Sequence, residues 1–292
     1  MLKRSHRLFA TRERLPVVAF RRMILFLSMV GLFSPGLETW AYGENYTQPF
    51  ELGRVDWTNG MVEASATGTP PGHALSPAQG RALAETEAET LARNCLIGIL
   101  HSIRIDSKST VKEALQHQGA MDDLVAAVLK DSYVVEKSLL ADGTVRVTVA
   151  IKLNGSFADL VLPKTIVTIK TVEQSQKKEE KFTGLIIDCR GIPVSPAMVP
   201  MIIDEEGQVV YGTAYVSRDY ALEEGMVAYA RGLAKARDNP RVGPKPLIVK
   251  GLRTVKARSS DIIISNADAG KIKGAGSNIS FLHRGRVLFV ME

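Results

Sequence analysis

Residues 54–66 read Arg-Val-Asp-Trp-Thr-Asn-Gly-Met-Val-Glu-Ala-Ser-Ala, and this stretch decides the class of fold that the sequence predicts. Asn59-Gly60 at its centre can adopt the positive φ angles of a type I′ turn, which joins two antiparallel strands. Val55 and Trp57 before the turn, and Val62 after it, supply apolar residues to the two strands. The stretch therefore predicts a β-hairpin.

A long helix is expected after this hairpin. Ser76-Pro77 is typical of a helix start, because serine can cap the first backbone N–H groups and proline has no N–H to leave unpaired. Small and apolar residues then recur at helical spacing as far as Ser102, namely Ala84, Ala88, Leu91, Ala92, Cys95 and Ile99. Because this stripe is mostly alanine, the helix should lie close against a sheet.

A second hairpin completes the first predicted domain, residues 42–155. Shorter helices are expected at Thr110–His117 and Met121–Leu129, and Asp142-Gly143 then separates two alternating apolar runs. Residues 42–52 show no periodic signal and are interpreted as a mobile segment. The order of hairpin, helices and hairpin predicts a two-layer α+β domain.

A second α+β domain is predicted for residues 183–292, after a linker at 156–182 that contains the charge-dense stretch Thr171–Lys181. One further strand is expected near Val161–Ile169, and one helix over Asp219–Arg237. Strands and a short helix complete this domain, at 185–188, 201–203, 209–211, 247–255, 261–264, 265–272 (the helix) and 287–291. The predicted fold class is α+β, with two small two-layer α/β sandwich domains and mainly antiparallel sheets.

The first 41 residues have the three parts of a signal peptide. A basic stretch ends at Arg21-Arg22, the apolar run Met23–Phe33 follows, and small residues precede a cut after Ala41. The apolar run is too short to cross a hydrocarbon core, which takes about 20 residues. We therefore expect an exported, periplasmic protein without a transmembrane segment in the mature chain.

The charge distribution argues against nucleic acid as a partner. Seven basic and two acidic residues among 1–41 account for five of the six net positive charges, so the remainder is nearly neutral. Candidates for contact with an anionic partner remain near the C-terminus. They are the predicted basic face Lys245, Lys250, Arg253, Lys256 and Arg258, together with Lys271, Lys273, Arg284 and Arg286.

No residue pattern in the sequence is typical of a catalytic, metal or cofactor site. The histidines are not spaced as metal ligands, and Cys95 and Cys189 are interpreted as free buried thiols. Ser109–Lys112 and Ser175–Lys178 match Ser-x-x-Lys, but the first is interpreted as a helix cap and the second as linker. Gly270–Gly276 is interpreted as a basic loop, because it lacks the spacing of a phosphate-binding loop.

Three stretches together resemble a known family. They are Val55–Gly68, the alanine-rich helix Ala78–Ile99 with its continuation to Val111, and Gly143–Val149. They are similar to the Lpp-twenty-type lipoproteins and to the N-terminal domain of flagellar assembly protein T, over about residues 50–155. The resemblance implies a non-enzymatic periplasmic domain associated with outer-membrane or flagellar assemblies. The chain departs from the lipoproteins because it has no lipobox cysteine.

The sequence therefore leads to an expected function and two alternatives. The expectation is a non-enzymatic structural or assembly protein that binds other envelope proteins, with self-association and peripheral contact with the outer membrane left open. The first alternative is a module that binds an anionic glycan or envelope polymer through the basic face. The second is a hydrolase whose site is assembled from residues distant in sequence.

Overall fold

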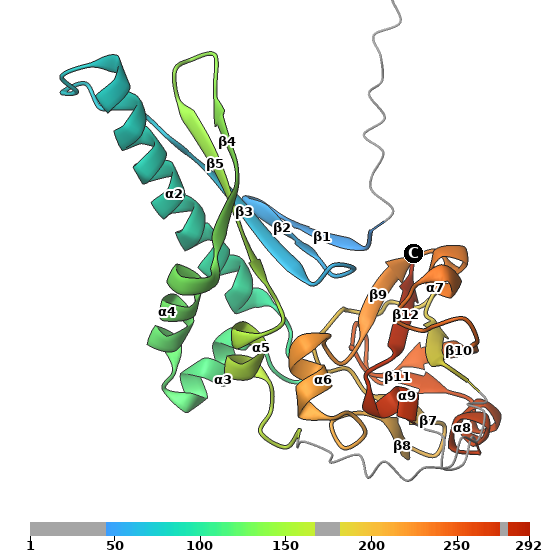
Figure 1. Ribbon diagram of the computed structural model, residues 1–292. Helices are drawn as coiled ribbons and strands as arrows, with labels where there is room; N and C mark the ends of the chain where they lie inside the picture. The colour runs from blue at the N-terminus through green and yellow to red at the C-terminus, as the bar shows by residue number, and fades with distance from the viewer. Residues whose placement is uncertain (1–44, 167–181, 275–279) are drawn as a thin grey trace, which may run out of the picture. The chain divides into compact units, whose positions relative to one another are not determined.

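The computed structural model describes residues 45–166, 182–274 and 280–292 (Figure 1). The predicted leader, the charge-dense stretch Thr171–Lys181 and the Ser175–Lys178 motif lie outside these residues. We call residues 45–166 the N-terminal module and residues 182–292 the C-terminal module. Each contains one β-sheet, and helices and strands occur in both, so the α+β class is confirmed.

The N-terminal module contains a five-stranded antiparallel sheet in the order β1-β2-β3-β5-β4. The hairpin predicted around Asn59-Gly60 is present, with Asp56 of β2 opposite Met61 of β3 and Gly60 at φ 62°. The hairpin at Asp142-Gly143 also forms, with Gly143 at φ 83°. The strands are β1 Thr47–Phe50, β2 Gly53–Asp56, β3 Met61–Gly68, β4 Tyr133–Leu139 and β5 Val145–Lys152.

The prediction that residues 42–52 form a mobile segment is wrong for the described part of that range. Thr47–Phe50 forms β1, which pairs with β2 in antiparallel register. The preceding Tyr46 is held by two hydrogen bonds, because its N–H donates to Thr58 Oγ1 (2.8 Å) and its carbonyl accepts from Trp57 N (3.0 Å). This strand is defined by its partner β2 and not by a periodic pattern of its own.

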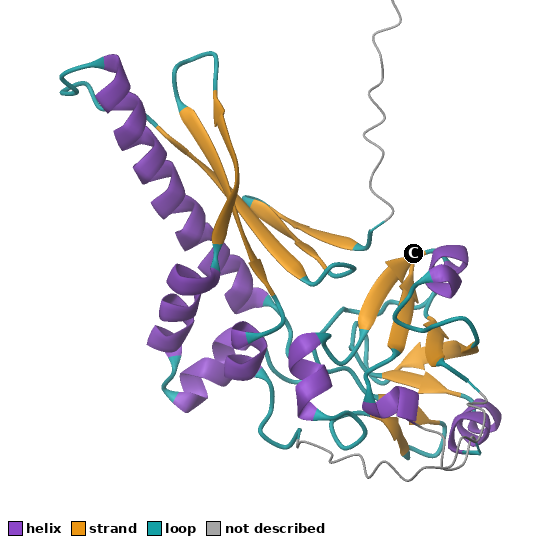
Figure 2. Cartoon of the chain, in the orientation of Figure 1, coloured by secondary structure: helices purple, strands orange, loops and turns teal. Residues whose placement is uncertain are grey.

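Helix α2 (Pro77–Ser102) covers one face of the antiparallel sheet (Figure 2). Ser76 is its N-cap and accepts a hydrogen bond from Gln79 N, as predicted. The alanine stripe lies against the sheet so closely that a Cβ on Gly68 of β3 would sit 2.0 Å from the carbonyl oxygen of Ala84. The stripe continues through Leu96 and Leu100, both fully buried, whereas the predicted Leu91 is 41% exposed.

Three shorter helices follow α2 in the N-terminal module. They are α3 (Val111–Gln118), α4 (Met121–Asp131) and α5 (Ser156–Val161). The α3 helix begins with a capping box, in which Thr110 and Glu113 exchange side-chain and backbone hydrogen bonds. The Ser109–Lys112 motif is therefore a helix start, as predicted.

The start of the predicted linker is a folded part of the N-terminal module. Residues 156–161 form α5, whose Phe157, Ala158 and Val161 are buried, and the strand expected from Val161 is absent from the described residues 161–166. These three apolar residues recur at helical spacing, and a helix here can bury all three against α3 and α4.

The C-terminal module contains a seven-stranded sheet in the order β8-β7-β11-β10-β6-β12-β9. Four of its six strand pairings are parallel, so the sheet is mixed, whereas mainly antiparallel pairing was expected. The central strands β6 and β12 are buried along their whole length, which is the pattern of parallel strands covered on both faces. The strands are β6 Gly184–Asp188, β7 Ile202–Asp204, β8 Val209–Tyr211, β9 Ala228–Arg231, β10 Pro246–Thr254, β11 Ile262–Ile264 and β12 Val287–Met291.

The single helix predicted for Asp219–Arg237 is wrong. The structure has α6 (Arg218–Glu223), then the strand β9, then α7 (Leu233–Asp238). Gly225 and Gly232 lie between these elements at φ 77° and 83°, a backbone conformation that interrupts a right-handed helix. The remaining helices, α8 (Asn266–Lys273) and α9 (Ser280–His283), lie before β12, and Ser265 caps α8.

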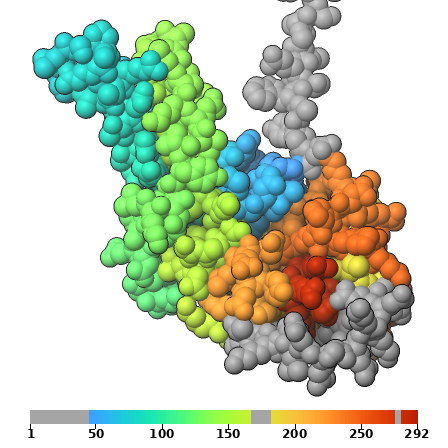
Figure 3. Space-filling view, in the orientation of Figure 1, coloured from blue at the N-terminus to red at the C-terminus, as the bar shows by residue number. Residues whose placement is uncertain are grey.

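The two modules share one hydrophobic core. A single cluster of buried side chains runs from Val55 in β2 to Met291 in β12, and a second, smaller cluster lies beneath α7. Residues of β1–β3 (blue) adjoin those around β9 (orange) in the space-filling view, and α5 contacts α6 (Figure 3). Residues 43–292 accordingly form one compact unit.

Candidate functional site

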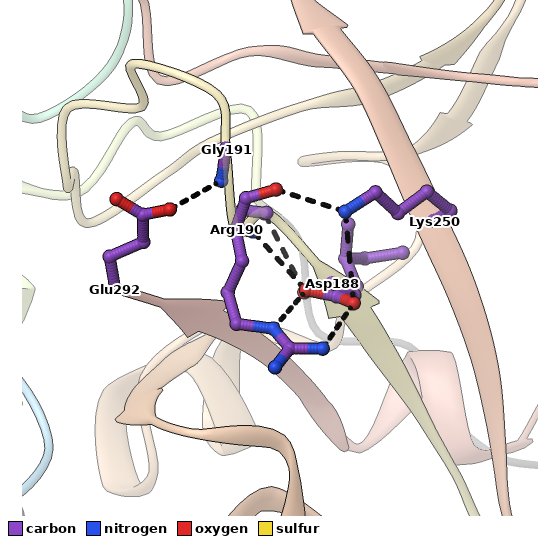
Figure 4. Close-up of polar contacts among 7 residues, drawn as sticks. Asp188, Arg190, Gly191, Lys250 and Glu292 are labelled. Atoms are coloured by element: carbon purple, nitrogen blue, oxygen red, sulfur yellow. Dashed lines mark hydrogen bonds and ion pairs between the residues drawn. The ribbon is translucent and has the colours of Figure 1, made fainter.

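Charged side chains gather at the carboxyl ends of the strands β6 and β12, beside the neighbouring strand β10. Asp188 is the last residue of β6, Lys250 lies opposite it on β10, and Glu292 follows β12 (Figure 4). Ligands of open parallel sheets bind at the carboxyl ends of the strands, so this edge is the first place to look for chemistry. We call Asp188, Arg190, Lys250 and Glu292 the strand-end cluster.

The carboxylate of Asp188 is the centre of this cluster. Its Oδ1 accepts from Arg190 Nε at 2.8 Å and its Oδ2 from Arg190 Nη2 at 2.9 Å, a two-point ion pair. Lys250 Nζ lies 3.8 Å from Asp188 Oδ2 and donates to the carbonyl of Arg190 at 2.9 Å. Glu292 Oε1 accepts from the N–H of Gly191, which has φ 84°.

These contacts fix the protonation of Asp188. The hydrogen bonds from Arg190 lower the pKa of its carboxyl to about 2, against the opposing effect of burial. Asp188 is only 8% exposed and is ionised at any physiological pH. A carboxylate with this pKa and an occupied ion pair is a poor proton acceptor, so Asp188 is poorly suited to act as a general base, and its contact with Lys250 links the end of β6 to β10.

The buried side chains Cys189, Tyr211 and Tyr229 of the C-terminal module are also poor candidates for a nucleophile. Cys189 is buried and free, and desolvation raises the pKa of its thiol far above the usual range. Burial likewise raises the pKa of the Tyr211 and Tyr229 hydroxyls, which donate to the carbonyls of Met226 and Ala197. Cys95 is free and half-buried on α2.

Metal ligands do not converge within the described residues, where no three His, Cys, Asp or Glu side chains could share an ion. His101, in the last turn of α2, is the most unusual of the histidines. Its Nε2 is buried without a hydrogen-bond partner, and desolvation, aided by the charge of Lys112, lowers the pKa of its imidazole. It is therefore neutral at physiological pH.

The five residues of the predicted basic face are exposed. Lys250 belongs to the strand-end cluster, while Lys245, Arg253, Lys256 and Arg258 make no ion pair with any described residue. Of the further candidates, Lys271 pairs with Asp268 and Lys273 with Asp204. Gly270–Gly274 is the end of α8 and not a loop, and the rest of that motif lies outside the described residues.

A cavity of about 170 Å³ lies between the modules, and Trp57, Met198 and Tyr229 contribute to its wall. The Tyr229 ring meets the edge of Trp57 at a centroid distance of 5.5 Å, and it also contacts Phe289 at 5.7 Å. Its hydroxyl accepts from Ala197 N (2.9 Å) and donates to Ala197 O (2.7 Å). Tyr229 therefore joins the hairpin turn of one module to the sheet of the other.

Backbone hydrogen bonds reinforce this junction. The N–H groups of Met198 and Val199 donate to the carbonyls of Arg104 and Ile105, at 3.0 and 2.7 Å. Gly155 N donates to Leu222 O at 2.7 Å. Such contacts depend on two chain segments distant in sequence, so sequence patterns gave no sign of them.

The Asp-x-Arg pair at the end of the apolar strand β6 is the local signal that could have revealed the strand-end cluster.

Comparison with known families finds one match to part of the chain. Residues 184–292 match the family described as Treponema pallidum Tp0624, second domain. The match begins at the first residue of β6 and covers every strand of the seven-stranded sheet. No curated protein matches the chain. Among the described residues, no helix is both long enough and apolar enough to cross a membrane.

Proposed function

We propose that this chain is an exported envelope protein that acts by binding other envelope proteins and carries out no reaction of its own. The observation that carries the proposal is the free face of the antiparallel sheet, opposite α2. A shallow hollow of about 670 Å³ lies there, and its lining includes Glu63, Arg146 and Val135. The lining combines charged side chains with the exposed apolar residues Leu52 and Val135, and such a mixture of apolar anchors and polar groups suits recognition of another protein surface.

The strand edges of this sheet are unsuited to pairing with another strand. Edge strand β1 carries Pro49, and edge strand β4 has a register shift between Val134 and Glu136 followed by Lys137. Proline, bulges and charges are the usual means by which proteins prevent edge-to-edge association. The face of the sheet, not its edge, is therefore the proposed surface.

The envelope location rests on the leader, with its basic stretch, short apolar run and cleavage-like end at Ala41. The resemblance of residues 50–155 to Lpp-twenty-type lipoproteins and to flagellar assembly protein T supports the same location. It also supports an assembly role at the outer membrane or the flagellar base.

Crosslinking in the native cell tests this proposal. A photoreactive amino acid at Val135, 51% exposed in the hollow, should capture a discrete envelope protein. The matched control is the same label at Leu83, 41% exposed on α2. Capture of the same proteins from both positions, or of none from Val135, would contradict a binding surface in the hollow.

A second function, binding of an anionic envelope polymer, is favoured by a specific observation. Arg284 and Arg286 have no carboxylate partner within the described residues, although both line one hollow. This function and the first are compatible, since they use different surfaces.

A further inference from the structure

A second open hollow, of about 560 Å³, lies in the C-terminal module beside the hairpin turn of the N-terminal module. Its lining includes Tyr220, Glu224, Arg241, Arg284 and Arg286. Thr58 of the hairpin turn also reaches it, so both modules contribute. We call it the arginine hollow.

Arg241 lines this hollow, and each nitrogen of its guanidinium donates to a backbone carbonyl. Its Nε donates to Gly285 O at 2.8 Å, and its two terminal nitrogens donate to Glu224 O and Gly225 O at 2.5 Å each. Carbonyl oxygens satisfy hydrogen bonds but carry no full negative charge. Desolvation lowers the pKa of Arg241, as expected of a half-buried cation that has no carboxylate within ion-pair distance among the described residues.

The same hydrogen bonds explain why the other two arginines stand beside it. Gly285, at φ 60°, forms the turn between α9 and β12, and Arg284 and Arg286 flank it on either side. The hydrogen bond from Arg241 Nε to Gly285 O holds this turn beside Arg241. Glu224 is the only acidic residue among the described lining residues, which include three arginines.

The lining also indicates the class of ligand. Guanidinium groups bind carboxylate and phosphate oxygens through two parallel hydrogen bonds, and sheltered ones bind them more tightly than fully hydrated lysines. Tyr220 is 37% exposed and can stack on a ring, and Thr58 and Asn239 supply polar groups. Large apolar side chains, which anchor most protein partners, are scarce in the lining.

We propose that the arginine hollow binds an acidic sugar unit, carrying a carboxylate or a phosphate, of an envelope polysaccharide. This inference rests on the second of the two proposed functions. It moves the binding site from the predicted face Lys245–Arg258 to Arg284 and Arg286, which flank the turn that Arg241 holds. None of the five residues of the predicted face is among the described residues that line the cavity or the two hollows. Lys250 is also already paired with Asp188.

The test is a titration of the full-length mature chain with trigalacturonate, whose sugars carry carboxylates, and separately with glucose 6-phosphate. Maltotriose serves as the neutral control. We expect binding of at least one acidic probe and none of maltotriose. Reversal of both charges, Arg284→Glu with Arg286→Glu, should weaken binding at least about tenfold.

A matched variant separates this site from general attraction between charges. Lys245→Glu with Lys256→Glu changes the net charge by the same amount on the predicted basic face, and should weaken binding less than about threefold. Thermal unfolding checks that both variants fold, and Arg286→Gln gives a milder change if the double reversal does not. Equal weakening by both reversals, or no binding of either acidic probe, would overturn the proposal.

Two further results test the class of ligand and separate this inference from the proposed protein-binding function. An acidic peptide such as hexaglutamate that binds the arginine hollow more tightly than trigalacturonate would overturn the carbohydrate assignment. The Val135 crosslink should survive the Arg284 and Arg286 reversal, because the two hollows share no described lining residue. A protein that keeps this crosslink but binds no acidic sugar would refute the inference alone.

Discussion

The two sheets of this protein contrast in how their strands are connected. The N-terminal sheet is antiparallel throughout, and its hairpins join strands that are neighbours in sequence. In the C-terminal sheet, β6 pairs with β10 and β12, which lie about 60 and 100 residues further along the chain. The first arrangement is specified largely by local turns, whereas the second depends on contacts between distant segments.

The difference extends to how charge is used. In the N-terminal module, several carboxylates cap turns and helices, as Asp56 and Glu113 do. In the C-terminal module, ion pairs and buried arginines connect separate strands and loops, as in the strand-end cluster and at Arg241. Mutation of a contact between residues close in sequence should therefore destabilise only the element that contains it. Mutation of a contact between distant segments should destabilise both modules.

The largest effect is expected at the junction of the two modules. Replacing Tyr229 by Ala removes a fully buried ring and both hydrogen bonds to Ala197, and should cost about 3–5 kcal/mol of unfolding free energy. Urea unfolding measures the loss, and hydrogen exchange shows where it acts. Faster exchange in β2 and β3 as well as β9 is expected, while loosening confined to the C-terminal module would contradict one shared core.

Gly68→Ala should cost about 3 kcal/mol by forcing β3 away from α2. Its Cβ would lie 2.0 Å from the Ala84 carbonyl oxygen, and backbone cannot yield as a side chain can. Gly72→Ala is the matched control, since nothing lies within 4 Å of the added carbon. Thermal unfolding of the two variants should differ clearly, and equal melting temperatures would show that the helix is not pressed on the sheet.

Asp188→Asn should cost about 2 kcal/mol at pH 7, because the native pKa of about 2 lies below that of an unfolded aspartate. The carboxylate stabilises the fold above about pH 4, and this contribution disappears as the pH falls toward 2. Urea unfolding at a series of pH values should show the wild type and variant converging as the pH falls. A constant difference down to pH 2 would mean that the ion pair with Arg190 is not the source.

The smallest effect is expected at a local cap. Thr110→Ala removes the side chain that caps α3 and should cost about 1 kcal/mol. Thr110→Ser, which keeps the hydroxyl, is the control and should stay close to wild type. Hydrogen exchange should become faster mainly in α3. If exchange in the C-terminal module became as fast as in Tyr229→Ala, the proposed difference between local and long-range contacts would be wrong.

Local signals in the sequence predicted the hairpins at Asn59-Gly60 and Asp142-Gly143, the start of α2 and the close approach of its alanine stripe. Each depends on backbone geometry within a few residues, so a short stretch carries the whole signal. The same reasoning failed over Asp219–Arg237, where apolar spacing suggested a helix. Gly225 and Gly232 interrupt it, and pairing with β12 makes Ala228–Arg231 a strand.

The sequence by itself determined the α+β class, most element positions and the distinct charge of the first 41 residues, because these depend on local periodicity and composition. Only the tertiary structure decided that the second sheet is mixed, that Tyr229 joins the modules, and that Lys250 is held by Asp188. It also brought Arg241 beside Arg284 and Arg286, more than 40 positions away in the chain. The strand order and such contacts between distant side chains follow from the packing of the whole core, which no short stretch of sequence specifies.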